Sequence, residues 1–131
     1  MATSPVYAAT PKIGSATLGG FDASFTSPSS ASTIVTGGSS GSKIEEVVIQ
    51  GLATLAAGIV NLWTHDGSTY RLFDQVLLTT SPTASTTVAA FRAIRQYSNL
   101  WIPNGSTFRA SHTTTGNDTS KIAVTAFYAD L

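Results

Sequence analysis

The sequence reads GIVNLWTH over residues 58–65, then Asp66-Gly67, then STYRLFDQVLL over residues 68–78. Both longer runs are rich in β-branched and aromatic residues, which suit the pleated and half-buried surface of a sheet. The Asp-Gly pair between them supplies the positive φ angles that a two-residue type I′ turn requires. The stretch therefore predicts a β-hairpin.

The register of this hairpin follows from the length of its turn. Counting outward from a two-residue turn places Trp63 opposite Tyr70. Leu72 then shares the face of that pair, and Phe73 points to the other face, because successive side chains alternate across a strand.

Further runs of strand-like composition lie on both sides of the hairpin, separated by turns rich in Gly, Ser, Pro and Asn. The expected fold is all-β: an antiparallel β-sandwich of about eight strands, because turns recur at the spacing typical of sandwiches and barrels. Jelly-roll topology is the first choice, and an immunoglobulin-like sandwich is the alternative. Only Leu52–Ala57 could form a short helix. The further strands are expected at residues 12–18, 32–35, 43–52, 88–97, 100–102, 107–113 and 121–128.

A length of 131 residues fits one domain. Residues 1–11 contain two prolines, which disfavour a helix and predict an extended arm ahead of a sandwich domain over residues 12–131. The arm is either a frayed terminus or a segment that docks on a neighbouring subunit. In the second interpretation Val6 and Tyr7 are the residues that bind the partner.

Charged residues make up 11% of the chain, and seven basic residues balance seven acidic ones. Soluble domains average about 25% charged residues, so this surface repels other proteins weakly and favours assembly with copies of itself or with neighbours. A nucleic-acid-binding protein needs a basic patch for phosphate contacts, and the charge balance argues against one. The absence of cysteine excludes disulfides and thiolate metal sites.

The sequence predicts no membrane partner. Its longest apolar run, Leu52–Val60, is interrupted by Thr54 and Gly58 and is too short to span a bilayer. The opening residues, Met1–Pro5, have neither the charged nor the apolar region of a secretory signal, so we expect synthesis in the cytoplasm. Without such a signal, the sequon at Asn117 is expected to serve only as part of a turn.

The patterns that could carry catalysis are weak. Residues 37–41 match G-x-S-x-G with Ser39 in the nucleophile position, but a nucleophile elbow needs a helix after the serine and here a strand is expected. Glu45 and Glu46 are neighbours on an expected strand, so they should point to opposite faces and cannot form a facing acid–base pair. The sequence predicts no catalytic residue and a protein that is not an enzyme.

The ionisable residues suggest no metal site and no cofactor. His65 and His112 are far apart in sequence and are expected at the surface or at strand edges. Arg92 and Arg95, three residues apart on a strand, should face opposite ways, with one of them against a carboxylate. Asp74 is expected to pair with a basic residue on a neighbouring strand.

Aromatic side chains are the remaining candidates for binding, either as a platform for sugars or as an interface hot spot. Most aromatics of a small β domain belong to its core, and Trp101 is the expected exception because it precedes the turn at residues 103–105. In the loop over residues 21–32, Phe21 and Phe25 are expected to act as plugs. The aromatic candidates are Trp63, Tyr70, Tyr97, Trp101 and Tyr128.

Three stretches resemble small virion proteins of tailed bacteriophages: SPVYAATPKIG at residues 4–14, HDGSTYRLFD at residues 65–74, and NLWIP at residues 99–103. The resemblance covers most of the chain, contains no diagnostic motif and assigns no functional residue. It implies a capsid decoration (cement) protein, a homotrimer on the capsid exterior that binds the major capsid protein and clamps neighbouring subunits. The alternatives are a tail or fibre module that binds host-surface glycans and, third, a small sugar hydrolase.

Overall fold

The computed structural model describes residues 10–118 and 120–131, and it folds them almost entirely into β-strands. The expectation of an all-β chain of about eight strands is confirmed, and the runs predicted at residues 88–97 and 100–102 merge into one strand. The elements are β1 (Thr10–Thr17), β2 (Ser32–Thr36), β3 (Ser42–Gly51), β4 (Gly58–His65), β5 (Tyr70–Leu78), β6 (Arg92–Ile102), β7 (Thr107–His112), a 3₁₀ turn η1 (Thr115–Asn117) and β8 (Ile122–Asp130).

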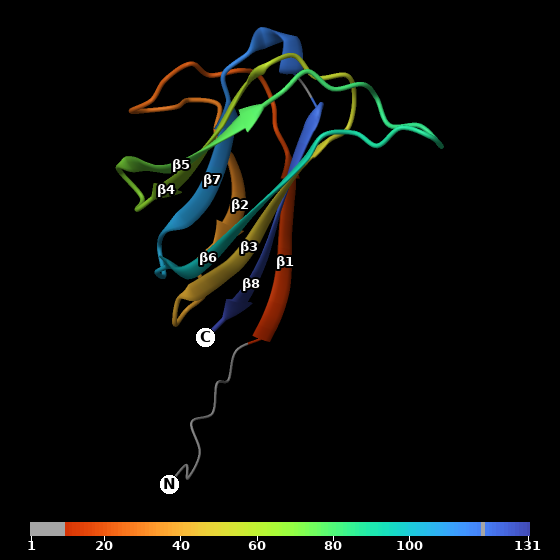
Figure 1. Cartoon of the computed structure of the whole chain (residues 1–131). Coiled ribbons are helices and arrows are strands. Elements are labelled where there is room, and N and C mark those ends of the chain that lie inside the picture. Colours follow the sequence, from red (N-terminus) through yellow and green to blue (C-terminus); the bar gives the residue numbers. More distant parts are fainter. Residues whose placement is uncertain (1–9, 119) are drawn as a thin grey trace, which may run out of the picture.

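The strands form two antiparallel sheets of four strands each (Figure 1). Sheet A has the order β1-β8-β3-β6, and sheet B has the order β2-β7-β4-β5. Apolar side chains from both sheets form one buried cluster between them, which confirms the predicted β-sandwich. Four connections between the sheets, β1–β2, β3–β4, β5–β6 and β7–β8, gather at the upper end of the molecule in Figure 1. The β2–β3 and β6–β7 connections lie at the lower end, where β1 begins and β8 ends.

The core follows the alternation of apolar residues along the central strands. Ile44, Val47 and Ile49 of β3 are buried, and so is every second residue of β8 from Ile122 to Ala126. Each fully buried Val, Leu or Ile contributes about 1.5–3 kcal/mol relative to an exposed one. These buried apolar side chains fix the register of each strand, because a shift of the pairing by one residue would turn them toward solvent.

The hairpin predicted from residues 58–78 is confirmed as β4 and β5, but its predicted two-residue turn is wrong. His65 pairs with Tyr70, so four residues form the connection. Among the turn residues only Gly67 has a positive φ, of 100°, whereas a type I′ turn needs two. The Asp66 carboxylate instead accepts hydrogen bonds from the backbone N–H groups of Ser68 and Thr69, at 3.0 and 2.8 Å. These bonds, with one from Arg71, hold the pKa of Asp66 well below its usual range.

The longer turn changes the register but keeps the main aromatic contact. Trp63 pairs with Leu72 rather than with Tyr70, and the register shifts next to this pair. The rings of Trp63 and Tyr70 nevertheless meet edge to face, with centroids 5.7 Å apart. Phe73 lies on the other face, as predicted, because its ring contacts the buried ring of Phe108 at 5.8 Å.

The predicted arm falls largely on residues 1–9, which lie outside the described residues, and so do its expected anchors Val6 and Tyr7. Strand β1 begins at Thr10, two residues before the expected start of the domain, and pairs there with Asp130. The chain thus enters the sandwich at an edge of sheet A.

Two loops at the upper end differ from their predictions. Residues 52–57 form no helix, because the backbone of Leu55 pairs instead with that of Ser81 in an isolated bridge. Residues 79–91 project from the body as a loop, seen in green and teal in Figure 1. Phe21 and Phe25 are both exposed, so the prediction that they plug the core is wrong.

Candidate interaction surfaces

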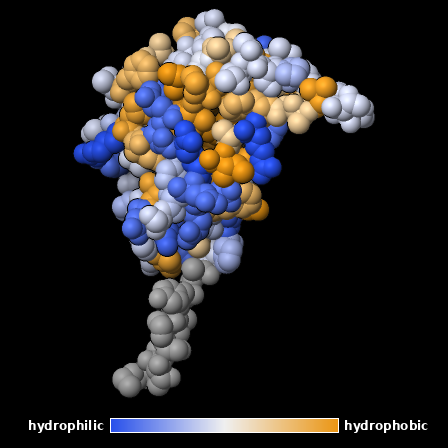
Figure 2. All heavy atoms as spheres, in the orientation of Figure 1, coloured by the Kyte–Doolittle hydropathy of each residue, from blue (hydrophilic) through white to orange (hydrophobic). Residues whose placement is uncertain are grey.

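The outer face of sheet A, opposite to the core, carries several exposed apolar side chains. Ile13 of β1 is 67% exposed and Phe127 of β8 is 40% exposed. On β6, Ile94 is 43% exposed and Trp101 is 50% exposed. Figure 2 shows apolar residues that reach the surface in separate groups between polar ones. A sheet face with this composition is a candidate for contact with another protein surface.

A shallow hollow lies at the corner of this face where β1 and β8 run side by side, and we call it the β1–β8 hollow. Its lining includes Ile13 and Phe127, which are partners across the two strands. Its surface is mostly apolar. The residues that line it are Pro11, Lys12, Ile13, Glu45, Phe127, Tyr128 and Ala129.

The charged groups at the border of the β1–β8 hollow have partners within the chain. The ammonium group of Lys12 lies 2.7 Å from the carboxylate of Asp130, and this contact raises the pKa of Lys12 and lowers that of Asp130. Asp130 also accepts a hydrogen bond of 2.6 Å from the hydroxyl of Ser42. Glu45 lies 3.4 Å from Lys43. A ligand in the hollow would therefore meet few unpaired charges.

Trp101 lies at the far side of the same sheet face, near the end of β6. Its strand partner is Lys43 of β3, and the turn at residues 103–105 follows directly. Half of its side chain is exposed. Its position allows contact with a partner, and its role in binding stays a prediction.

Glu45 and Glu46 do not alternate across β3 as predicted. The register of β3 with both of its neighbours shifts between Ile44 and Glu46, which marks a β-bulge. Ile44 and Val47 are both buried in the core, so the two glutamates between them lie on the outer side. They share a shallow hollow with Gln96, Tyr97 and Ser98. The extra residue of the bulge is the reason that simple alternation fails here.

Around Trp63 the outer face of sheet B is arranged differently, because the side chains there bond to one another. Trp63 is fully buried, and its indole N–H donates to the hydroxyl of Ser111 at 2.9 Å. The guanidinium of Arg109 donates to the hydroxyl of Tyr70 at 2.8 Å and lies 5.5 Å from the centre of its ring. Of the predicted aromatic candidates, Trp63 is therefore closed to any ligand.

A polar cluster closes the side of the sandwich where β5 and β6 face each other. The Asp74 carboxylate accepts a hydrogen bond of 2.7 Å from the hydroxyl of Tyr97 and lies 3.3 Å from the guanidinium of Arg95. Burial, and then Asp74, raise the pKa of Tyr97 far above its usual range. The prediction that Arg92 and Arg95 point to opposite faces of their strand is confirmed. Arg95 faces the carboxylate of Asp74, whereas Arg92 is exposed.

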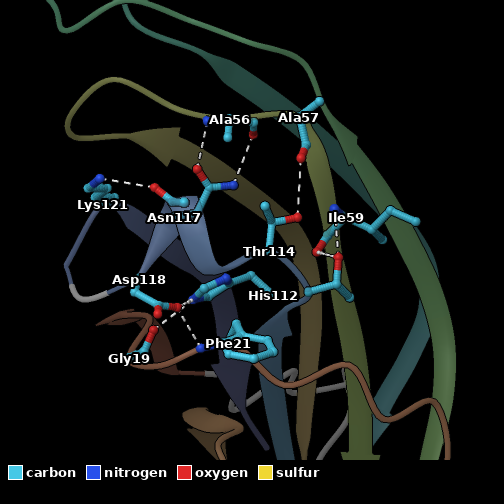
Figure 3. A network of polar contacts seen from close by, with 12 residues as sticks. Gly19, Phe21, Ala56, Ala57, Ile59, His112, Thr114, Asn117, Asp118 and Lys121 are labelled. Carbon is cyan, nitrogen blue, oxygen red and sulfur yellow. Dashed lines mark hydrogen bonds and ion pairs between the residues drawn. The ribbon is translucent and has the colours of Figure 1, made fainter.

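A second polar network ties three loops together at the upper end of the sandwich (Figure 3). Asn117 is fully buried, and its side-chain amide bonds to both backbone groups of Ala56, at 2.8 and 2.9 Å. Thr114 donates to the carbonyl of Ala57 at 3.1 Å. Asn117 is thus more than the turn residue that the sequence suggested, because it holds residues 52–57 in place.

His112 belongs to the same end of the molecule and is fully buried, so the prediction of a surface or strand-edge histidine is wrong for it. Its Nε2 atom lies 2.7 Å from the carbonyl oxygen of Gly19, and since a carbonyl only accepts, Nε2 carries the proton. The carboxylate of Asp118 lies 3.8 Å away and accepts a hydrogen bond from the backbone N–H of Phe21. These contacts fix the loop that leads from β1 to β2.

The G-x-S-x-G match at residues 37–41 forms the connection between β2 and β3. Strands lie on both sides of it, so Ser39 does not occupy a strand–turn–helix elbow. The neighbouring Ser42 is buried and serves as a structural link, since it accepts a hydrogen bond from the N–H of Gly38 and donates to Asp130.

Within residues 10–118 and 120–131, no three His, Asp or Glu side chains come together in a group that could hold a metal ion. No helix in the described part of the chain has the length and apolar character needed to cross a membrane. Comparison with known proteins finds no matching family model, no matching curated protein and no matching solved structure.

Proposed function

We propose that this chain is a structural virion protein that decorates a phage capsid and stabilises it by binding capsid subunits and copies of itself. The observation that supports this proposal best is the open outer face of sheet A. On its β3–β6 half, Ile94 and Trp101 are exposed by 43% and 50%. A rigid sheet that presents apolar side chains among few charges is suited to a broad contact with another protein surface.

The pairing of the strands supports jelly-roll topology. β1 pairs with β8, β2 with β7, β3 with β6, and β4 with β5. This is the pairing of one long hairpin of eight strands, rolled so that its successive strand pairs alternate between the two sheets. Jelly rolls are common in capsid proteins and lectins, so the topology agrees with both the decoration role and its alternative.

A binding assay with empty capsid shells of the phage that encodes this chain tests the proposal. The double variant Ile94→Asp, Trp101→Asp places charge on the β3–β6 half of sheet A and should no longer sediment with shells. The matched control is Leu77→Asp, because Leu77 is 67% exposed and belongs to sheet B. Thermal unfolding of each variant establishes that it is folded. Sedimentation of the double variant at the level of the unchanged protein would contradict the proposal.

Removal of residues 1–9 gives a second test of the same function. The arm predicted from the sequence would join subunits to each other or to the shell, so its loss should weaken sedimentation with shells while the sandwich stays folded. A truncated chain that binds shells as tightly as the full chain would remove the arm from the proposal.

The second candidate function is a tail or fibre module that binds host-surface glycans. The half-exposed ring of Trp101 favours it, because a sugar can stack on an exposed aromatic face. Trp101→Ala should then lose binding to a glycan panel and keep the thermal stability of the unchanged chain. A chain that binds no glycan on a broad panel would exclude this function.

A further inference from the structure

We propose that the β1–β8 hollow binds residues 1–9 of a second copy of this chain. The inference rests on the proposed function in one respect only, namely that copies of the chain bind one another. It adds the surface that receives the arm and the segment that occupies it.

The surface of the hollow is suited to an uncharged, partly apolar segment. Its lining includes the cross-strand pair Ile13 and Phe127, exposed by 67% and 40%. Lys12 and Glu45 at its border already have partners in Asp130 and Lys43, at 2.7 and 3.4 Å. An uncharged segment that covers the hollow removes apolar area from water and leaves these ion pairs intact.

The backbone of β1 beside the hollow also lies at a sheet edge, where an added strand could pair with it. β1 is an edge strand of sheet A, and its register with β8 runs without a shift from Thr10 to Thr17. The other edge strands all show a register shift, β2 against β7, β5 against β4 and β6 against β3. An extended segment can therefore pair with β1 more regularly than with any other edge in the described part of the chain.

Residues 1–9 have the composition that this surface requires. Their sequence, MATSPVYAA, contains no charged side chain and includes Val6 and Tyr7. A tyrosine adds a large apolar ring area at a low cost in side-chain entropy. Nine residues span at most about 30 Å when extended, which sets how far the segment can reach beyond the start of β1 toward an adjacent subunit.

The position of the hollow favours the arm of another copy over the chain's own arm. Pro11 and Ile13 form part of the hollow, and Thr10 is already paired in β1. For Tyr7 to enter the hollow of its own chain, the backbone would have to reverse within Ala8-Ala9-Thr10. That stretch contains none of the residues that favour tight turns, and the proline after Thr10 keeps Thr10 extended.

Cysteine cross-linking tests the proposal directly, because the natural chain has no cysteine. Ala8→Cys labels the arm beside Tyr7, and Ala129→Cys labels the hollow, each with a minimal change of volume. The matched control is Ala123→Cys, which lies six residues earlier on the same strand, on the same face and in the same half-buried class. Two full-length single-cysteine chains, distinguished by tags of different mass, are mixed without capsid and mildly oxidised.

The proposal expects a disulfide-linked pair of Ala8→Cys and Ala129→Cys chains that forms about tenfold faster than the pair with Ala123→Cys, because binding raises the effective concentration of the two thiols. Adding Tyr7→Ser to the arm should abolish this preference. Equal rates for the two positions on β8 would overturn the proposal. So would a double variant, Ala8→Cys with Ala129→Cys, that links only within one chain. Since no capsid is present, failure here is distinct from failure to bind shells.

Discussion

The two tryptophans of this chain lie on the outer faces of the two sheets, and their environments differ. Trp63 on sheet B is fully buried, donates to Ser111 and meets the ring of Tyr70, which is itself bonded to Arg109. Trp101 on sheet A is half exposed.

The difference indicates that the two outer faces have different roles, one in stability and the other in binding. The side chains around Trp63 on sheet B satisfy one another, so that part of the face contributes to the stability of the sandwich and offers little to a partner. Side chains on sheet A leave apolar area in contact with water, which another surface can cover. Substitutions around Trp63 should therefore reduce the free energy of unfolding, whereas those of the exposed apolar side chains on sheet A should change binding.

The largest effect on stability is expected for Trp63→Ala. Truncation of a buried Trp lowers the free energy of unfolding by about 3–5 kcal/mol, because packing is lost and a cavity remains. Urea denaturation followed by circular dichroism measures the change. A loss below about 1 kcal/mol would show that sheet B does not depend on this residue and would break the comparison.

Ser111→Ala should have the next largest effect. It leaves the indole N–H of Trp63 buried without its acceptor, which costs about 1–3 kcal/mol. A double-mutant cycle with Trp63→Phe identifies the cause, because phenylalanine has no N–H to leave unpaired. The effect of Ser111→Ala should shrink in the Trp63→Phe background, and full additivity would contradict the assigned bond.

The next effect, a pH dependence of stability, is expected from Tyr97, which lies where β5 and β6 face each other. Its pKa is raised in the folded chain, so above about pH 10, where an unfolded tyrosine ionises, the unfolded state gives up the proton first. Stability should therefore fall as the pH rises past 10, by at most about 1.4 kcal/mol for each pH unit from this group. Tyr97→Phe should flatten that fall in urea titrations at pH 9, 10 and 11. An unchanged slope would mean that Tyr97 does not cause it.

A smaller effect is expected for Asp130→Asn at the end of sheet A. Lys12 and Ser42 lower the pKa of Asp130, so its contribution is present above the unfolded value of about 3.9 and is lost as the pH falls below it. The variant should lose stability at pH 7 and show a shallower decrease in Tm between pH 5 and pH 2, a range set by the same reference value of about 3.9. Equal acid profiles for the two proteins would contradict this role.

The smallest effect on stability is expected for Trp101→Ala. An exposed side chain outside the core changes the free energy of unfolding by less than about 0.5 kcal/mol. Its urea curve should overlay that of the unchanged protein, in contrast to Trp63→Ala. A loss comparable with that of Trp63→Ala would show that the two faces are equivalent.

The sequence predicted the sandwich well because its strands carry strong local signals. The β-branched run of β3 and the Asp-Gly between β4 and β5 depend on neighbouring residues only. The errors in the hairpin and in β3 have another origin. The carboxylate of Asp66 competes for the turn, and the bulge at Glu45 responds to two flanking strands, so neither is visible in a short window of sequence.

The candidate surfaces were harder to predict than the fold. The sequence singled out Trp101, and the structure places it on an open sheet face. The sequence did not indicate that Ile13 and Phe127 form an apolar pair, because they are separated by most of the chain and become partners only when β1 pairs with β8. The burial of His112 and Asn117 was missed for the same reason, since their partners come from distant loops.

By itself the sequence determined the all-β class, most strand positions and a surface of low charge, because these follow from composition and from the preferences of adjacent residues. The tertiary structure decided which strands are neighbours, which tryptophan is covered and where an apolar hollow is left open. Those features depend on contacts between residues far apart in the chain, and only the packing of two sheets around one core brings such residues together.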